Sequence, residues 1–98
     1  MKLNKEIILQ KLRDIKPQLQ EKYNLTELAL FGSYSRDEQT DESDIDLMVK
    51  MATPDFKKYS KTYHILEDLF PGIKVQVVSR GAIKPKYFYY VEPDLIYA

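Results

Sequence analysis

Segments with a helical repeat alternate along this chain with short runs typical of strands, and this alternation restricts the fold more than any other feature. Two stretches carry apolar residues at steps of three and four, as amphipathic helices do: 4–23 and 53–70. Three shorter runs are apolar or alternate polar with apolar residues, which predicts strands: 25–31, 44–49 and 73–79. The order predicts an α/β fold in which helices cover one small sheet.

Proline and capping residues set the expected limits of the helices. Pro17 removes one backbone donor within the first stripe, so we expect that helix to kink there or to restart as a second segment. Thr53 and Pro54 are expected to open the second helix, with Thr53 as the cap and Pro54 at the first helical position. Pro71 and Gly72 are expected to close it.

Three other segments are predicted to form short elements. Residues 33–39, directly after a glycine, could form one or two helical turns. Residues 81–90 favour a final short helix interrupted by Pro85, and residues 95–97 favour an edge strand.

The composition is that of one soluble domain. The 98 residues, 44% hydrophobic and 31% charged, fit a single domain spanning residues 1–98. Fifteen basic and fifteen acidic side chains give a formal charge of zero, so no overall field draws the chain onto nucleic acid. Cysteine is absent, and no apolar run approaches the roughly 18 residues that a membrane helix needs. We expect a cytoplasmic protein whose main partner is neither a membrane nor a nucleic acid.

Asp44 and Asp46 are the first candidate site residues. An acidic run taken alone is most often a solvated loop. These two carboxylates, however, are two residues apart on a strand, so they project from one surface with Cα atoms roughly 6 to 7 Å apart. Such a pair repels unless a cation lies between the carboxylates, and hard oxygen ligands suit Mg²⁺.

Gly32 and Ser33 supply the second candidate feature. They follow a predicted strand and lie just upstream of the acidic pair. A glycine lets a phosphate approach the backbone, the serine offers a hydroxyl, and the exposed N–H groups of a helix start favour an anion. Phosphates and a metal ion could therefore meet at one place.

The chain carries these features in one compound motif, Leu30-Phe31-Gly32-Ser33-Tyr34-Ser35-Arg36 and then Ser43-Asp44-Ile45-Asp46-Leu47. It resembles the signature of the nucleotidyltransferase superfamily, and the chain as a whole is similar to the minimal, antitoxin-type members related to the DNA polymerase β palm. The predicted first helix, the third strand and the closing Ile96-Tyr97 match as well, so the resemblance covers nearly the whole chain. It implies a small mixed sheet flanked by helices and a Mg²⁺-dependent transfer of a nucleoside monophosphate with release of pyrophosphate.

The resemblance also implies a role for each residue of the motif. Asp44 and Asp46 would be the catalytic residues and the ligands of Mg²⁺ or Mn²⁺. Gly32 and Ser33 would hold the β- and γ-phosphates of ATP. Two more residues would support nucleotide binding: Ser43 and Arg36. A surface ion pair with a neighbouring acid is an equally good interpretation of the arginine.

The chain departs from the family pattern at two positions. Asp37 stands where the family usually has a glycine, so a residue less tolerant of left-handed geometry must end the short helix. Gln76 occupies the possible third-ligand position, where the family normally has a carboxylate. An amide carries no charge and cannot accept the proton, so transfer is expected to suffer more than binding.

Two functions remain open from the sequence. The chain could be an antitoxin-like enzyme that moves AMP from ATP onto a hydroxyl, such as that of a tyrosine, of a small helical HEPN-like partner protein. Alternatively, it could be a catalytically degraded nucleotidyltransferase fold that neutralises its partner by complex formation, with Gln76 as the motivating residue.

The aromatic run at 87–90 predicts where such a partner docks. Four successive aromatic residues cannot all face inward from one helix, so one or two of them should be exposed. Exposed tyrosines are favoured at protein interfaces.

Overall fold

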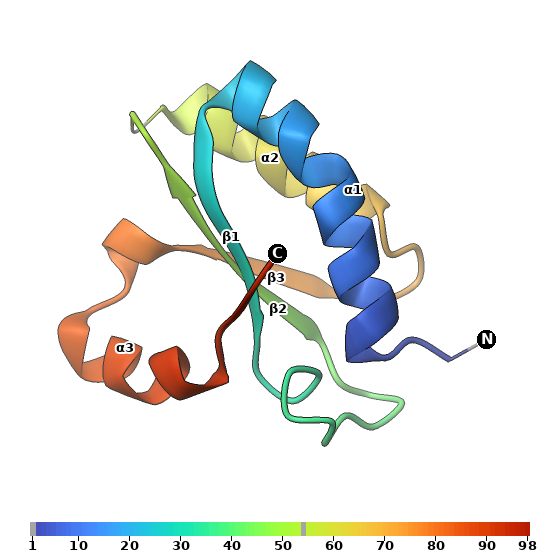
Figure 1. Ribbon diagram of the computed structural model, residues 1–98. Coiled ribbons are helices and arrows are strands. Elements are labelled where there is room, and N and C mark those ends of the chain that lie inside the picture. The colour runs from blue at the N-terminus through green and yellow to red at the C-terminus, as the bar shows by residue number, and fades with distance from the viewer. Residues whose placement is uncertain (1, 54) are drawn as a thin grey trace.

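A four-stranded mixed sheet forms the centre of the molecule (Figure 1). The computed structural model describes residues 2–53 and 55–98. The strands are β1 (Leu25–Phe31), β2 (Ile45–Met51), β3 (Val75–Ser79) and β4 (Ile96–Tyr97), in the order β3-β2-β1-β4. β1 is antiparallel to both β2 and β4, whereas β2 and β3 are parallel. The predicted α/β fold with a small mixed sheet flanked by helices is confirmed.

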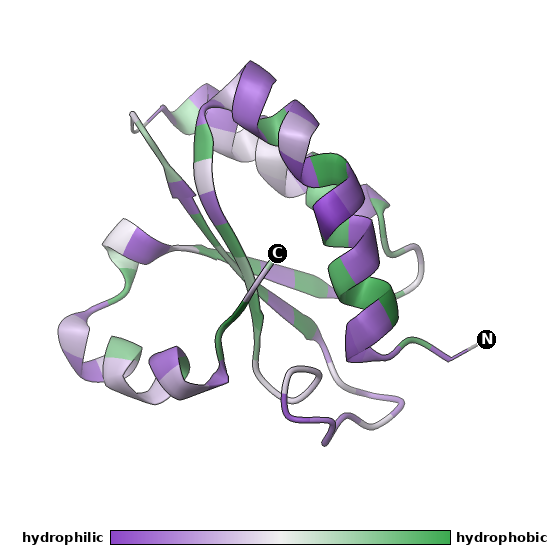
Figure 2. Ribbon diagram, in the orientation of Figure 1, coloured by the Kyte–Doolittle hydropathy of each residue, from purple (hydrophilic) through white to green (hydrophobic). Residues whose placement is uncertain are grey.

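The helices α1 (Lys5–Tyr23) and α2 (Phe56–Asp68) pack on one face of this sheet (Figure 1). The strands are largely hydrophobic at the centre of the sheet, and hydrophobic and hydrophilic residues alternate along α1 (Figure 2). The fully buried side chains between them form the core: Ile8, Leu12, Leu19, Leu28, Leu30, Ile45, Leu47, Val49 and Leu66. Because side chains alternate along a strand, the residues between these core positions point to the opposite face.

α1 continues through Pro17 as one helix, so the predicted restart as a second segment is wrong. The fully buried Leu12 and Leu19 precede and follow the proline. Burial of each leucine contributes roughly 1.5–3 kcal/mol, which is comparable with the cost of about 3 kcal/mol for an internal proline. The caps are clear: the Asn4 side chain accepts from the Ile7 N–H at 2.9 Å, and Asn24, with φ of 60°, ends the helix.

α2 begins two residues later than expected, because Asp55 and not Thr53 is its N-cap. The Asp55 carboxylate accepts from the N–H groups of Lys57 and Lys58, at 2.9 and 3.2 Å. Aspartate caps a helix better than threonine, and its negative charge suits the N-terminal end of the helix dipole. The expected role of Pro54 lies outside the described residues.

The segment after β3 lies on the other side of the sheet from α1 and α2 (Figure 1). It contains a short 3₁₀ turn η1 (Arg80–Ala82), the helix α3 (Pro85–Val91) and a second 3₁₀ turn η2 (Glu92–Asp94), before β4 completes the sheet. Pro85 starts α3 at its first turn instead of interrupting a longer helix, because a proline lacks only a donor that is unpaired there. No helix in the described part of the chain is long and apolar enough to cross a membrane.

Candidate active site

The acidic pair lies where β1 ends and β2 begins. Asp44 directly precedes β2, and Asp46 is the second residue of that strand. In the sheet, Asp46 lies between its two register partners, Phe31 of β1 and Gln76 of β3. Strand alternation places the Asp46 side chain on the face opposite α1 and α2, away from the main core.

Gly32 brings the backbone directly against this carboxylate. Its φ is 78°, a left-handed value that favours glycine. A Cβ atom added to Gly32 would lie 2.2 Å from Asp46 Oδ2, closer than any real contact. Only a glycine fits here, so the turn and the acidic pair form one continuous surface.

The residues after Gly32 make successive i→i+3 and i→i+4 hydrogen bonds, which is the bonding of the one or two helical turns predicted, although no regular helix forms. The Gly32 carbonyl accepts from the N–H groups of Ser35 and Arg36, at 3.1 and 3.3 Å, and the Ser33 carbonyl accepts from the Glu38 N–H at 2.9 Å. Asp37 has φ of 58°, which reverses the chain before a regular helix forms. The left-handed geometry expected at Asp37 is thus present, and the N–H groups that would face a phosphate belong to these short helical turns.

Asp46 is only partly exposed, and its surroundings favour the neutral form. Burial is the main cause of its raised pKa, and the negative charge of Asp44 raises the pKa further. The positive charge of Arg36 acts in the opposite sense. A cation at this place would relieve both unfavourable effects, because it would restore the interactions that the ionised carboxylate lacks.

Gln76 contacts the acidic pair through its amide group. Its Nε2 donates to Asp44 Oδ2 at 3.0 Å. The residue therefore lies where the resemblance implies a third ligand, but it supplies a hydrogen bond to a carboxylate instead of a third negative charge.

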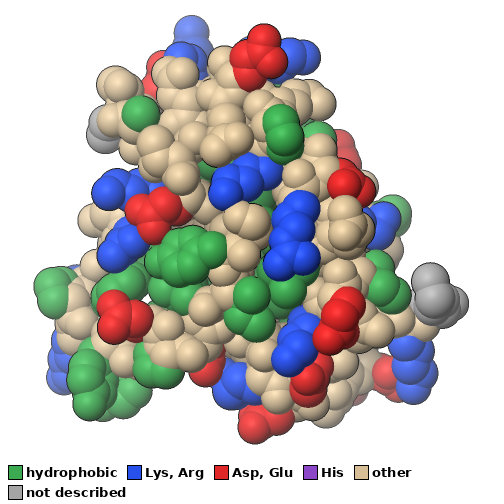
Figure 3. Space-filling model, viewed as in Figure 1, with side chains coloured by type: hydrophobic (Ala, Val, Ile, Leu, Met, Phe, Trp, Pro, Cys, Tyr) green, Lys and Arg blue, Asp and Glu red, His purple; other side chains and the backbone are tan. Residues whose placement is uncertain are grey.

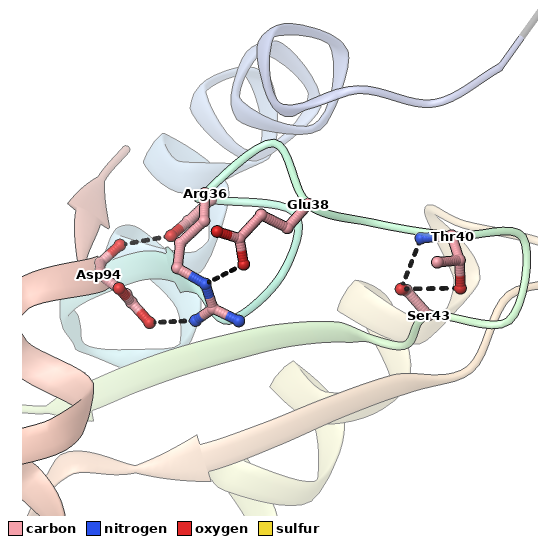
Figure 4. A network of polar contacts seen from close by, with 6 residues as sticks. Arg36, Glu38, Thr40, Ser43 and Asp94 are labelled. Atoms are coloured by element: carbon pink, nitrogen blue, oxygen red, sulfur yellow. Dashed lines mark hydrogen bonds and ion pairs between the residues drawn. The ribbon is translucent and has the colours of Figure 1, made fainter.

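Arg36 makes ion pairs within the chain. Its guanidinium donates to Glu38 and to Asp94 of η2, and both acids raise its pKa (Figure 4). The Ser35 hydroxyl also donates to the Asp94 carbonyl, at 2.7 Å. These bonds fasten the turn after β1 to the C-terminal segment. Asp94 was not predicted as a site residue, because no local pattern marks a contact between residues 58 positions apart.

Ser43 closes the loop that leads into Asp44. Its Oγ accepts from the Thr40 N–H at 2.9 Å, and its own N–H donates to the Thr40 carbonyl at 3.1 Å (Figure 4). A hollow of about 690 Å³ adjoins this loop and is lined by Ser43, Asp44 and Lys74 among others. The contacts make Ser43 a residue that shapes the approach to Asp44. Ser33, the remaining predicted residue, lies half-buried in the turn after Gly32.

The donors present fit a divalent cation that takes only part of its ligands from the protein. Within residues 2–53 and 55–98, no group of three or more histidine, cysteine or acidic side chains could hold a metal ion alone. Mg²⁺ typically binds through one or two carboxylates and completes its octahedron with water and substrate phosphate. Asp44 and Asp46, beside a turn that only a glycine can form, match that requirement.

A glycine turn that faces two carboxylates can bring a phosphate group close to a carboxylate-bound Mg²⁺. A family model described as "Nucleotidyltransferase domain" matches residues 12–96 of this chain. The chain belongs to this nucleotidyltransferase family, and it is a transferase.

Its relatives include a Methanocaldococcus jannaschii protein named "putative protein adenylyltransferase", which is 49% identical over 88 residues. That match covers 88% of this chain and 89% of the relative. "Protein adenylyltransferase MntA" of Thermococcus cleftensis is 33% identical over 70 residues, which cover 70% of each chain.

Solved structures share the fold. A "putative minimal nucleotidyltransferase" superposes with a TM-score of 0.75 at 25% identity, covering 96% of this chain and 95% of the other. A toxin–antitoxin structure with AMP-PNP has a TM-score of 0.65 at 28% identity, covering 97% of this chain and 72% of the other. The nucleotidyltransferase fold implied by the motif is therefore confirmed.

Proposed function

We propose that this protein transfers AMP from ATP onto a hydroxyl of a partner protein and acts as the antitoxin of a toxin–antitoxin pair. The observation that carries the proposal is the contact between Gly32 and Asp46, where an added Cβ would lie 2.2 Å from Oδ2. This contact supports the proposal because a glycine backbone that a phosphate could approach lies directly beside carboxylates that suit a metal ion.

Each residue has a distinct task in the proposed site. Gly32 and Ser33 hold the β- and γ-phosphates on the turn after β1, and Asp44 and Asp46 hold Mg²⁺ or Mn²⁺. A bound divalent cation would neutralise the phosphates and lower the pKa of the attacking hydroxyl. Two residues support the nucleotide from the rim of the site: Arg36 and Ser43.

The proposed reaction is a substitution at the α-phosphorus of ATP. The acceptor oxygen forms a bond to the α-phosphorus of ATP, the bond from that phosphorus to the bridging oxygen breaks, and pyrophosphate and the hydroxyl proton leave. The protein mainly positions the groups, which is the usual division of work in phosphoryl-type transfer.

The relatives support a nucleotide substrate and a protein acceptor. Two are named as protein adenylyltransferases, and one similar structure is a toxin–antitoxin with AMP-PNP. For this chain we propose a small helical HEPN-like toxin as the partner and a tyrosine as the modified residue.

The test is label transfer to the product of the neighbouring reading frame. Label from [α-³²P]ATP should appear on that protein, whereas label from [γ-³²P]ATP should not, because pyrophosphate leaves. Gly32→Ala should abolish transfer, because the added Cβ would clash with Asp46, whereas Lys11→Ala on the exposed side of α1 should not. Transfer of the γ-label, or equal transfer by Gly32→Ala, would contradict the proposal.

A second function is favoured by one observation, the amide of Gln76 at the third-ligand position. In that alternative the fold still binds the partner, but the transfer step is lost. Partner binding without label transfer by the natural protein would support it.

A further inference from the structure

A hollow of about 1030 Å³ lies away from the acidic pair, between the start of α2, the end of β3 and the segment that leads into α3. Apolar side chains make up most of its lining, including Phe56, Tyr59, Val78, Ile83 and Tyr87. Two of these aromatic rings are largely exposed: Phe56 at 83% and Tyr87 at 59%. We call this hollow the α2–α3 groove.

Among the described residues, α3 is only loosely covered by the rest of the chain. It has seven residues and none of them is buried. Hydrophobic side chains gather over it at the lower left of Figure 3. Its described attachments are few, and one is the Arg80 guanidinium over the Phe88 ring, 4.9 Å from the centroid. A helix this short is marginal alone, so a protein surface that covers the exposed ring of Tyr87 would stabilise it.

The free edge of β3 indicates which kind of element can enter the groove. β3 ends the sheet, and an added strand would need its outward carbonyls. The Tyr59 hydroxyl donates to the Val77 carbonyl at 2.9 Å, and the Tyr63 hydroxyl donates to the Val75 carbonyl at 3.4 Å. These bonds compete with strand addition and leave a helix as the better-fitting occupant.

The charges of the groove indicate the chemistry of that helix. Three charged residues line it: Lys50, Asp55 and Lys84. The Asp55 carboxylate is engaged in capping α2. Lys84 is exposed and pairs with no acid among the described residues. Lys50 pairs with Glu27 at 3.7 Å, so among the described residues Lys84 supplies the unpaired positive charge at the rim of this apolar groove, which complements an apolar stripe flanked by acidic residues.

We propose that the α2–α3 groove receives an amphipathic helix of the partner protein, with its apolar stripe between Phe56 and Tyr87 and its acidic flank at Lys84. The inference rests on the proposed transfer to a protein. It fits that function because Lys50 follows Asp46 by four residues on the same face of β2, a separation of roughly 13 Å. A partner held in the groove would thus reach the acidic pair.

The test compares residues that line the groove with exposed residues of α3 outside it, by calorimetry with the product of the neighbouring reading frame and without nucleotide. Phe56→Ala and Tyr87→Ala should each raise the dissociation constant about tenfold or more. The controls are Tyr89→Ala and Tyr90→Ala, whose rings are 77% and 69% exposed but do not line the groove. These should stay within about twofold of the natural protein.

Charge reversal gives a second, independent measurement. Lys84→Glu should slow association and make it less dependent on salt, whereas Lys11→Glu on the exposed side of α1 should not. Backbone hydrogen exchange in the complex should show protection at 56–59 and 83–87.

The outcomes separate the groove from the transfer activity. Normal binding by Phe56→Ala and Tyr87→Ala, or the absence of any complex, overturns the groove as the docking site. Self-association that Phe56→Ala abolishes would assign the groove to a second copy of this chain, and ATP binding lost in both variants would assign it to the nucleotide. If Phe56→Ala and Tyr87→Ala bind the partner normally and still transfer label, only the groove proposal is contradicted. If binding depends on these two residues but the natural protein transfers no label, only the transfer activity is contradicted.

Discussion

Asp46 is held where its negative charge is unfavourable in the free protein. Burial and the charge of Asp44 raise its pKa above the ordinary 3.8. A carboxyl group whose pKa is raised in the folded state binds its proton more tightly in the folded protein than in the unfolded chain. Stability is therefore greatest below the unfolded pKa and falls as pH rises through the folded pKa. A divalent cation requires this same negative charge, so the site would favour cation binding at the expense of the stability of the free protein.

Asp46→Asn should consequently stabilise the free protein at pH 7. The gain should be less than about 1 kcal/mol, since solvent screens a partly exposed carboxylate, and it should shrink toward pH 4 as the aspartate becomes protonated. Urea unfolding at the two pH values measures it. Asp41→Asn is the control, because that side chain is 93% exposed. A loss of stability at pH 7 in Asp46→Asn would contradict the cause assigned to the pKa shift.

Gln76→Asp tests the position where the chain departs from its family. The substitution removes the hydrogen bond to Asp44 and supplies the missing carboxylate where the acceptor hydroxyl loses its proton. General-base groups contribute about 10² to 10⁴ in rate, so AMP transfer should rise by a factor in or below that range. ATP affinity should change far less.

The control for that experiment is Gln76→Asn, which keeps an amide and adds no charge. Initial rates of label transfer from [α-³²P]ATP at saturating Mg²⁺ distinguish the variants. Slower transfer by Gln76→Asp than by the natural protein would mean that the amide bond to Asp44 is itself part of the working site.

At the level of elements, local patterns predict the strands well and the helix starts less well. The alternation around Asp46 is a two-residue repeat that the pleat imposes, so β2 was predictable. The start of α2 depended on a competition between Thr53 and Asp55 that sequence spacing alone does not decide. The short helical turns after Gly32 were predictable from the sequence, and they do not continue as a regular helix because Asp37 reverses the chain.

Asp55→Ala should destabilise the protein by about 1 kcal/mol, because two N–H groups of α2 lose their acceptor. Thr53→Ala, at the cap position expected from the sequence, should leave the unfolding free energy unchanged within about 0.5 kcal/mol. Denaturant unfolding of the two variants side by side measures both effects. Equal losses would mean that the helix start is shared between the two residues.

For the whole molecule, the predicted site residues come together only because the sheet brings distant segments side by side. The pairing of β1 with β2 places Gly32 against Asp46, and the motif spacing made this foreseeable. No sequence pattern indicated the hydrogen bonds from Ser35 and Arg36 to Asp94, since these bonds depend on the pairing of β4 with the edge of β1. Through them the turn of the candidate site is joined to the C-terminal segment that carries α3.

If the acidic pair holds the metal ion as proposed, nucleotide binding should depend on a cation, and the stability of the whole domain should report this. Without metal, two carboxylates and a triphosphate repel, so ATP in EDTA should not change the unfolding midpoint. With Mg²⁺ or Mn²⁺ and ATP at about 100 times the dissociation constant, binding should stabilise the protein by about 2.7 kcal/mol. For a domain of this size that is a rise of roughly 10–20 °C in the midpoint. The double variant Asp44→Asn with Asp46→Asn should show no such rise, although it folds. An equal shift in EDTA, or an unchanged shift in the double variant, would remove Asp44 and Asp46 as the metal ligands.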